Sequence, residues 1–214
     1  LIEQAVLLSD GRAFVLSTSF QLLRHLYEQL VPRLKPHGIE VLCQGKEPRH
    51  VLLDKKIKDP RSVLLGTDSF WEGVDVQGDA LTNVILTRLP FRVPSDPLLE
   101  ARVEALENQG ENSFLSYTVP SATIKFKQGF GRLIRGRHDR GTVLILDKRV
   151  IEKRYGSRFL SALPPECPRF VGTRKEVLNQ LNAFHRSANA EAKSVAQTSN
   201  KAGSTSAAEP RRHR

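Results

Sequence analysis

The segment Gln128–Arg135 combines residue types that suit chemistry on a phosphate. On a helix that advances about 100° per residue, a glutamine, a glycine and two arginines fall on one side. These polar positions are Gln128, Gly131, Arg132 and Arg135, and the apolar positions opposite are Phe126, Phe130, Leu133 and Ile134. Phosphoryl transfer requires mainly positioning and fixed positive charge, which guanidinium groups supply. We therefore predict one face anchored in a core and one available for catalysis; a solvated basic face is the alternative.

Gly131 is unusual at the centre of this helical pattern. Glycine inside a helix costs about 1 kcal/mol relative to alanine. A glycine between functional side chains indicates that another group approaches the backbone there. We expect that approach at Gly131.

The loop Gly66–Asp75 is dense in polar side chains and follows a short apolar run. The Thr67 hydroxyl and nearby backbone N–H groups suit contact with phosphate. Glu72 and Asp75 suit hydrogen bonds from a ribose, an arginine or a partner domain. The alternative is a turn in which Asp68 caps a short helical segment and Asp75 caps a bend.

Three small hydroxyl residues, Ser17, Thr18 and Ser19, precede a predicted helix. The N-terminus of a helix attracts anions, so these residues are candidate phosphate donors. Simple capping by Ser19 is the alternative, and both roles are compatible. Gln44–Gly45 repeats the arrangement more weakly after the next predicted strand.

The segment Arg88–Pro97 contains three prolines, which restrict its conformation before any ligand arrives. Phe91 in this loop suits two roles. It is either a platform on which a base stacks or an apolar plug under a rigid loop.

Short apolar runs alternate with amphipathic stretches along the chain, which predicts a doubly wound α/β fold with a mainly parallel sheet. The predicted strands are Ala13–Ser17, Ile39–Cys43, Ser62–Leu65, Val84–Leu86 and Thr142–Leu146. The predicted helices are Phe20–Leu34, His50–Ile57, Pro97–Asn108, Ile124–Ile134 and Lys175–Arg186. In this class, ligands bind beyond the carboxyl ends of the strands.

The composition of the 214 residues narrows the class of protein. The chain has no apolar run of about 20 residues and no signal peptide, which predicts a cytosolic globular protein. Cys43 and Cys167 lie far apart, so they predict neither a zinc site nor a four-cysteine iron–sulfur cluster. Methionine is absent, which indicates a piece of a longer open reading frame. The net charge of +10 favours a polyanionic partner such as nucleic acid.

Four regions follow from these patterns. We predict a connector over residues 1–10, the main domain over 11–164, a helical extension over 165–186 and a disordered basic tail over 187–214. Six cations and two anions from Arg186 onward give this end of the chain a charge of +4. The tail either adds salt-sensitive DNA affinity or has no role.

The motifs together resemble the second RecA-like domain of superfamily 2 helicases, and within it the DinG family of bacterial DNA helicases related to XPD. Gln128–Arg135 resembles motif VI, Gly66–Asp75 motif V and Phe14–Phe20 motif IV. The segments Leu89–Pro97, Pro120–Ala122, Asp147–Arg149 and Tyr155–Gly156 also resemble the family. The resemblance covers residues 11–164 with the motifs in the expected order.

The resemblance implies a role for each matching residue. Arg135 resembles an arginine finger for the γ-phosphate of ATP, Arg132 its partner, and Gln128 a group that orients the nucleotide or the attacking water. Residues implied in coupling ATP to DNA are Gly131, Glu72, Gly73 and Asp75. Residues implied at single-stranded DNA are Thr18, Ser19, Thr67 and Asp68.

Three features used for ATP, metal or iron–sulfur binding are absent from this sequence. The sequence contains no phosphate loop, no metal-binding acid pair and no cysteine quartet. ATP contacts, Mg²⁺ and any iron–sulfur cluster would belong to an N-terminal RecA-like domain, so the chain alone should be inactive. The resemblance implies a 5′ to 3′ helicase acting in DNA repair or replication. A non-catalytic nucleic-acid-binding module and an ATPase that signals without unwinding are the alternatives.

Overall fold

The computed structural model describes residues 1–67, 70, 80–92, 97–131, 133 and 140–188. Contacts divide the chain into two units, Leu1–Phe170 and Val171–Arg214. The first unit contains the sheet and all the predicted site residues that are described. No helix in the described part of the chain is both long and apolar enough to span a bilayer.

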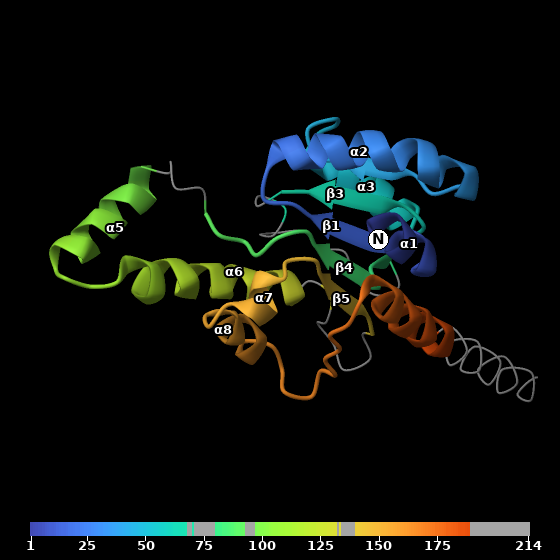
Figure 1. The fold of residues 1–214 in the computed structure, drawn as a ribbon. Coiled ribbons are helices and arrows are strands. Elements are labelled where there is room, and N and C mark those ends of the chain that lie inside the picture. Colours follow the sequence, from blue (N-terminus) through green and yellow to red (C-terminus); the bar gives the residue numbers. More distant parts are fainter. Residues whose placement is uncertain (68–69, 71–79, 93–96, 132, 134–139, 189–214) are drawn as a thin grey trace, which may run out of the picture. The chain divides into compact units, whose positions relative to one another are not determined.

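The first unit is built on five parallel strands, which confirms the predicted α/β class (Figure 1). The strands are β1 (Ala13–Leu16), β2 (Val41–Cys43), β3 (Val63–Gly66), β4 (Asn83–Leu86) and β5 (Thr142–Ile145). Their order across the sheet is β2-β3-β1-β4-β5. Leu16 pairs with both Gly66 and Leu86, so β1, β3 and β4 end level with one another.

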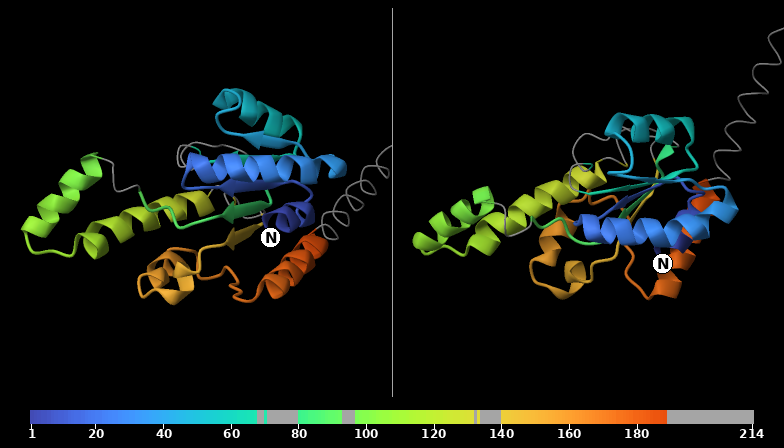
Figure 2. Two further views of the ribbon diagram at one scale, coloured as in Figure 1. Left: turned by 45° about the horizontal axis from the view of Figure 1, so that its top comes forward. Right: turned by 90° about the horizontal axis from the view of Figure 1, so that it is seen from above.

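Helices cover both faces of the sheet, as continuous apolar strands require. Helices α1 (Ile2–Leu8) and α2 (Phe20–Leu34) lie on one face, and α3 (Arg49–Lys58) and α6 (Val119–Phe130) lie on the other (Figure 2). Alternate strand residues therefore enter separate layers. The layer under α3 and α6 includes Phe14, Leu16, Val84, Leu86, Leu52 and Phe126.

The first helix occupies part of the segment that was predicted to be a connector. Ala5 and Val6 are fully buried, and the Asn83 side chain donates a hydrogen bond to the Ala5 carbonyl. The predicted domain boundaries stay predictions.

Helix α2 begins and ends where its sequence predicts. The Ser19 hydroxyl accepts a hydrogen bond from the Leu22 amide, which confirms the predicted cap. At the other end, η1 (Lys35–His37) leads to Gly38 at φ 67°, where glycine carries no steric cost. The Ile39 amide then bonds to the Leu34 carbonyl. Ile39 thus closes the helix, and the strand predicted to start there begins at Val41.

The predicted helix over Ile124–Ile134 is wrong at both ends. It begins at Val119, directly after the π-helix η3 (Phe114–Thr118), with Pro120 in its first turn. It ends at Phe130, between two glycines that favour helix poorly. The Leu133 amide bonds to the Phe130 carbonyl three residues back, as in a turn. Helix α5 (Pro97–Asn108) matches its prediction.

Two short helices, α7 (Arg149–Glu152) and α8 (Gly156–Ser161), follow β5 and were not predicted. Gly156 allows them to pack closely, because a Cβ atom there would lie 2.3 Å from the Val150 carbonyl oxygen. Val150 and Phe159 from these helices join the core.

The second unit contains a helix over residues 174–188, which confirms the predicted helix and extends it. Thr173 and Glu176 form a capping box at its start. The Glu176 carboxylate accepts hydrogen bonds from the Thr173 amide at 2.8 Å and hydroxyl at 2.7 Å. Ser187 and Ala188, predicted to be disordered, are helical, and the rest of the predicted tail lies outside the described residues.

Candidate functional site

The order of the strands creates a place for a ligand at the carboxyl edge of the sheet. From β1 the chain runs through α2 toward β2 and β3, and it then crosses to β4 and β5 on the other side. In open parallel sheets, ligands bind where the strand order reverses in this way. That point lies between the ends of β1 and β4.

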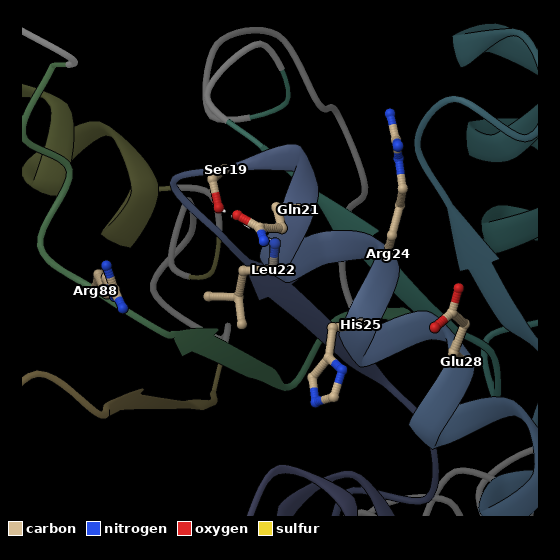
Figure 3. Close-up of a pocket in the computed structure, with 7 residues that line it drawn as sticks. All are labelled: Ser19, Gln21, Leu22, Arg24, His25, Glu28 and Arg88. Carbon is tan, nitrogen blue, oxygen red and sulfur yellow. Dashed lines mark hydrogen bonds between the residues drawn. The ribbon is translucent and has the colours of Figure 1, made fainter.

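A groove of about 740 Å³ occupies this point (Figure 3). It is lined by Ser19, Gln21, Leu22, Arg24, His25 and Glu28 from the start of α2 and by Arg88 from the loop after β4. Figure 3 shows Ser19 and Gln21 at the first turn of the helix, with Arg88 across from them. Two arginines against one glutamate, beside a helix N-terminus, favour an anionic ligand.

The loop after β1 is held by its own hydroxyl groups. The buried Ser17 hydroxyl donates to the Ser19 carbonyl at 2.8 Å and accepts from the Ser19 amide at 3.2 Å. Ser19 caps α2 as an acceptor, so its own hydroxyl hydrogen stays able to donate. Thr18 is partly exposed and Ser19 is exposed. Capping and phosphate contact are therefore compatible at Ser19.

Thr67, a predicted phosphate contact, is held by the side chain of Gln44. Its amide and hydroxyl both donate to the Oε1 atom of Gln44, at 2.6 and 3.0 Å. Only 6% of Thr67 is exposed. These bonds join the ends of β2 and β3, so a phosphate would reach Thr67 only by displacing Gln44.

Gln128 is exposed on the last turn of α6, and Gly131 follows it. A Cβ atom on Gly131 would meet the carbonyl oxygens of Lys127 and Gln128 at 3.5 and 3.6 Å, which is ordinary contact. The described neighbours thus give no steric reason for glycine at this position. The other predicted residues, Asp68, Glu72, Gly73, Asp75, Arg132 and Arg135, lie outside the described residues.

Phe91 fits the second of its two predicted roles, an apolar plug. Its ring stacks on Phe114 at 5.9 Å between centroids and meets the edges of Tyr155 and Phe159, each at 5.7 Å. The Arg149 guanidinium lies 5.3 Å from the ring centroid. Neighbouring side chains therefore already pack around the Phe91 ring, where a base would otherwise have stacked.

A carboxylate clamp, which sequence reasoning missed, fixes the loop after β4. Asp147 accepts hydrogen bonds from the Leu89 amide at 2.9 Å and from the Arg149 amide at 3.0 Å, and it pairs with the Arg149 guanidinium at 2.6 Å. Burial alone would raise the pKa of Asp147, but the bonds from Arg149 and Leu89 outweigh it and lower the pKa. The available signal was Asp-x-Arg directly after a strand. The clamp ties the end of β5 to the loop that carries Arg88.

Within the described ranges, no three His, Cys, Asp or Glu side chains are grouped closely enough to hold a metal ion. Cys43 is buried, and burial raises the pKa of its thiol although Lys46 opposes the shift. Cys167 is partly exposed.

Comparison with known proteins identifies the fold family. A family model described as "Helicase C-terminal domain" matches residues 2–166. The ATP-dependent DNA helicase YoaA of Haemophilus influenzae is 49% identical over 156 residues, covering 73% of this chain and 24% of the relative. The ATP-dependent DNA helicase DinG of Photobacterium profundum is 44% identical over 161 residues, covering 73% of this chain and 23% of the relative.

A third relative, named 3′-5′ exonuclease DinG, comes from Bacillus subtilis. It is 41% identical over 156 residues, covering 72% of this chain and 17% of the relative. The chain thus spans a quarter or less of the length of these relatives. The chain belongs to the helicase C-terminal domain family, among the DinG and YoaA proteins.

Proposed function

We propose that this chain acts as the C-terminal motor domain of an ATP-dependent DNA helicase. The observation that carries the proposal is the groove between the ends of β1 and β4, where Arg88 lies across from the first turns of α2, which carry Arg24. A positively charged groove at the strand-order reversal suits a phosphate backbone. The family supplies the reaction, since the relatives from Haemophilus influenzae and Photobacterium profundum are named ATP-dependent DNA helicases.

In this proposal, the carboxyl edge of the sheet grips one DNA strand. Thr18 and Ser19 contact phosphates from the first turn of α2, and Asp68 contacts the strand from the loop after β3. Thr67 also contacts a phosphate once its amide and hydroxyl no longer donate to Gln44. The hydrogen bonds between Gln44 and Thr67 thus offer a two-state element for tightening and loosening the grip.

The second role is to complete an ATP site whose other wall belongs to an N-terminal RecA-like domain. Arg135 would place positive charge at the γ-phosphate, with Arg132 and Gln128 beside it, and Gly131 would belong to the same wall. Glu72, Gly73 and Asp75 would transmit the state of the nucleotide to the DNA side. Mg²⁺ and any iron–sulfur cluster would be held by the other domain.

Closure and opening of the two domains around ATP would then move the strand, with a 5′ to 3′ direction as the family resemblance implies. We place this activity in DNA repair or replication in the cytoplasm. The chain alone would lack hydrolysis.

A strand-displacement assay tests the proposal. The full-length protein that contains this chain should displace a strand from a forked duplex only with ATP and Mg²⁺, and the 214-residue chain should displace none. Hydrolysis of ATP without displacement by the full-length protein would instead support a signalling ATPase. DNA binding without hydrolysis would support a non-catalytic binding module.

A further inference from the structure

A second hollow, of about 370 Å³, lies between α2 and the loop after β2. It is lined by Phe20, Arg24, Tyr27, Glu28, Cys43, Gln44, Gly45 and Lys46. It shares Arg24 and Glu28 with the groove described above. Figure 3 shows Arg24 and His25 leaving α2 on opposite sides, so the two hollows flank the helix.

Phe20 is an exposed aromatic residue at the start of α2, with 49% of its surface accessible. Gly45 lies next to it at φ 88°, and a Cβ atom there would stand 4.0 Å from the Phe20 ring. The loop therefore approaches the ring through a residue without a side chain, and about half of Phe20 stays accessible. Tyr27 follows Phe20 by seven residues, which places both rings on one face of the helix.

Positive charge lies between and beside these two rings. Arg24 is one helical turn from each of them. The Lys46 Nζ atom lies 5.2 Å from the centroid of the Tyr27 ring. Among the described residues of the lining, Glu28 is the single anion. Aromatic planes combined with an excess of cations are what proteins use to hold unstacked bases and their phosphates.

We propose that this hollow, here called the base seat (Phe20, Arg24, Tyr27 and Lys46), holds one unstacked base of a single DNA strand. The base stacks on Phe20, and Lys46 and Arg24 contact its phosphates. The volume falls within the roughly 300–1,000 Å³ of small-ligand pockets. This inference rests on the proposed function and adds a contact to bases beside the contacts to phosphates. Stacking makes the contact tolerant of sequence, as translocation requires.

The test compares two labelled strands of equal length, an oligothymidylate and the same strand with abasic sugars, by fluorescence anisotropy with the 214-residue chain. Phe20→Ala should weaken binding of the oligothymidylate about 5- to 150-fold, from 1–3 kcal/mol for each stacked base. Its affinity for the abasic strand should stay unchanged. Phe20→Trp should restore the preference for bases, since its ring also stacks.

Two further variants act as controls. Phe170→Ala removes a phenylalanine of the same exposure, 50%, outside the hollow, and should change neither affinity. Lys46→Gln should weaken binding of both strands alike and reduce the salt slope by about 0.7, the value for one phosphate contact on a single strand.

Three results would overturn the base seat. These are an unchanged affinity of Phe20→Ala for the oligothymidylate, an equal loss on both strands, and an equal loss in Phe170→Ala. Failure of the wild-type chain to bind either strand would overturn the proposed DNA grip itself, and the base seat with it.

Discussion

Lys56 is almost completely buried, with only 1% of its surface exposed, which is unusual for a lysine. Its Nζ atom donates to the Pro60 carbonyl at 3.0 Å and to the Ser62 carbonyl, which matches the two N–H groups of a neutral amine. Burial lowers the pKa of Lys56 to about 7, with Arg12 adding to the shift and Asp59 opposing it. We predict that this lysine makes stability depend on pH in the neutral to alkaline range.

The direction of the pH dependence follows from how tightly the folded and unfolded states each hold the Lys56 proton. The unfolded chain keeps the Lys56 proton up to its ordinary pKa of 10.5, and the folded chain keeps it only up to about 7. The unfolded state therefore binds more protons between these values, so stability rises with pH. At about 1.4 kcal/mol for each pKa unit, the whole effect amounts to about 5 kcal/mol. Between pH 6 and pH 9 it amounts to about 2.5 kcal/mol.

The assay is urea unfolding of the wild type and of Lys56→Met across pH 6 to 9. The free energy of unfolding of the wild type should gain about 2.5 kcal/mol relative to the variant over this range. Lys58→Met, an exposed position on the same helix, is the matched control and should follow the wild type. A difference between wild type and Lys56→Met that stays constant within about 0.5 kcal/mol would refute the neutral amine.

Other substitutions test the parts that shape the site, each measured by urea unfolding. Asp147→Ala should lower stability by about 2–4 kcal/mol, because it leaves the Leu89 amide without its acceptor and a partly buried guanidinium without its carboxylate; a loss under about 0.5 kcal/mol would exclude the clamp. Ser19→Ala should cost about 1 kcal/mol through loss of the helix cap, and Ser19→Asp should retain most of it. Gly66→Ala should cost about 1–3 kcal/mol, since its Cβ atom would lie 2.8 Å from the Cβ atom of Phe70; an unchanged midpoint would show that the contact relaxes freely.

Local rules predicted the sheet and its main helix from the sequence. The cap at Ser19 and the leucines at helical spacing locate α2 at the residues observed. The run Val84–Leu86 locates β4 because a buried parallel strand is apolar throughout. These features depend on neighbouring residues and on burial, which the sequence pattern records directly.

Features that depend on distant contacts were harder to predict. One local feature was also missed. Helix α6 ends at Phe130, which has a glycine on each side, whereas the helical spacing of the arginines suggested that the helix continues. The hydrogen bonds from Thr67 to Gln44 join residues 23 positions apart, and those from Leu89 to Asp147 join residues 58 apart. No periodicity in the sequence signals such pairs. Phe20 was read as part of a helix, and only its exposure and the bare Gly45 backbone beside it suggest a role.

The rate of ATP hydrolysis by Arg135→Ala tests the central claim most directly. The measurement uses the full-length protein that contains this chain, at saturating ATP and single-stranded DNA, with the exposed Arg140→Ala as control. The proposal predicts that Arg135→Ala loses about a thousandfold or more in turnover while its DNA affinity stays close to wild type. Turnover within about twofold of wild type would contradict the arginine finger, and with it the assignment of this domain to the ATP site.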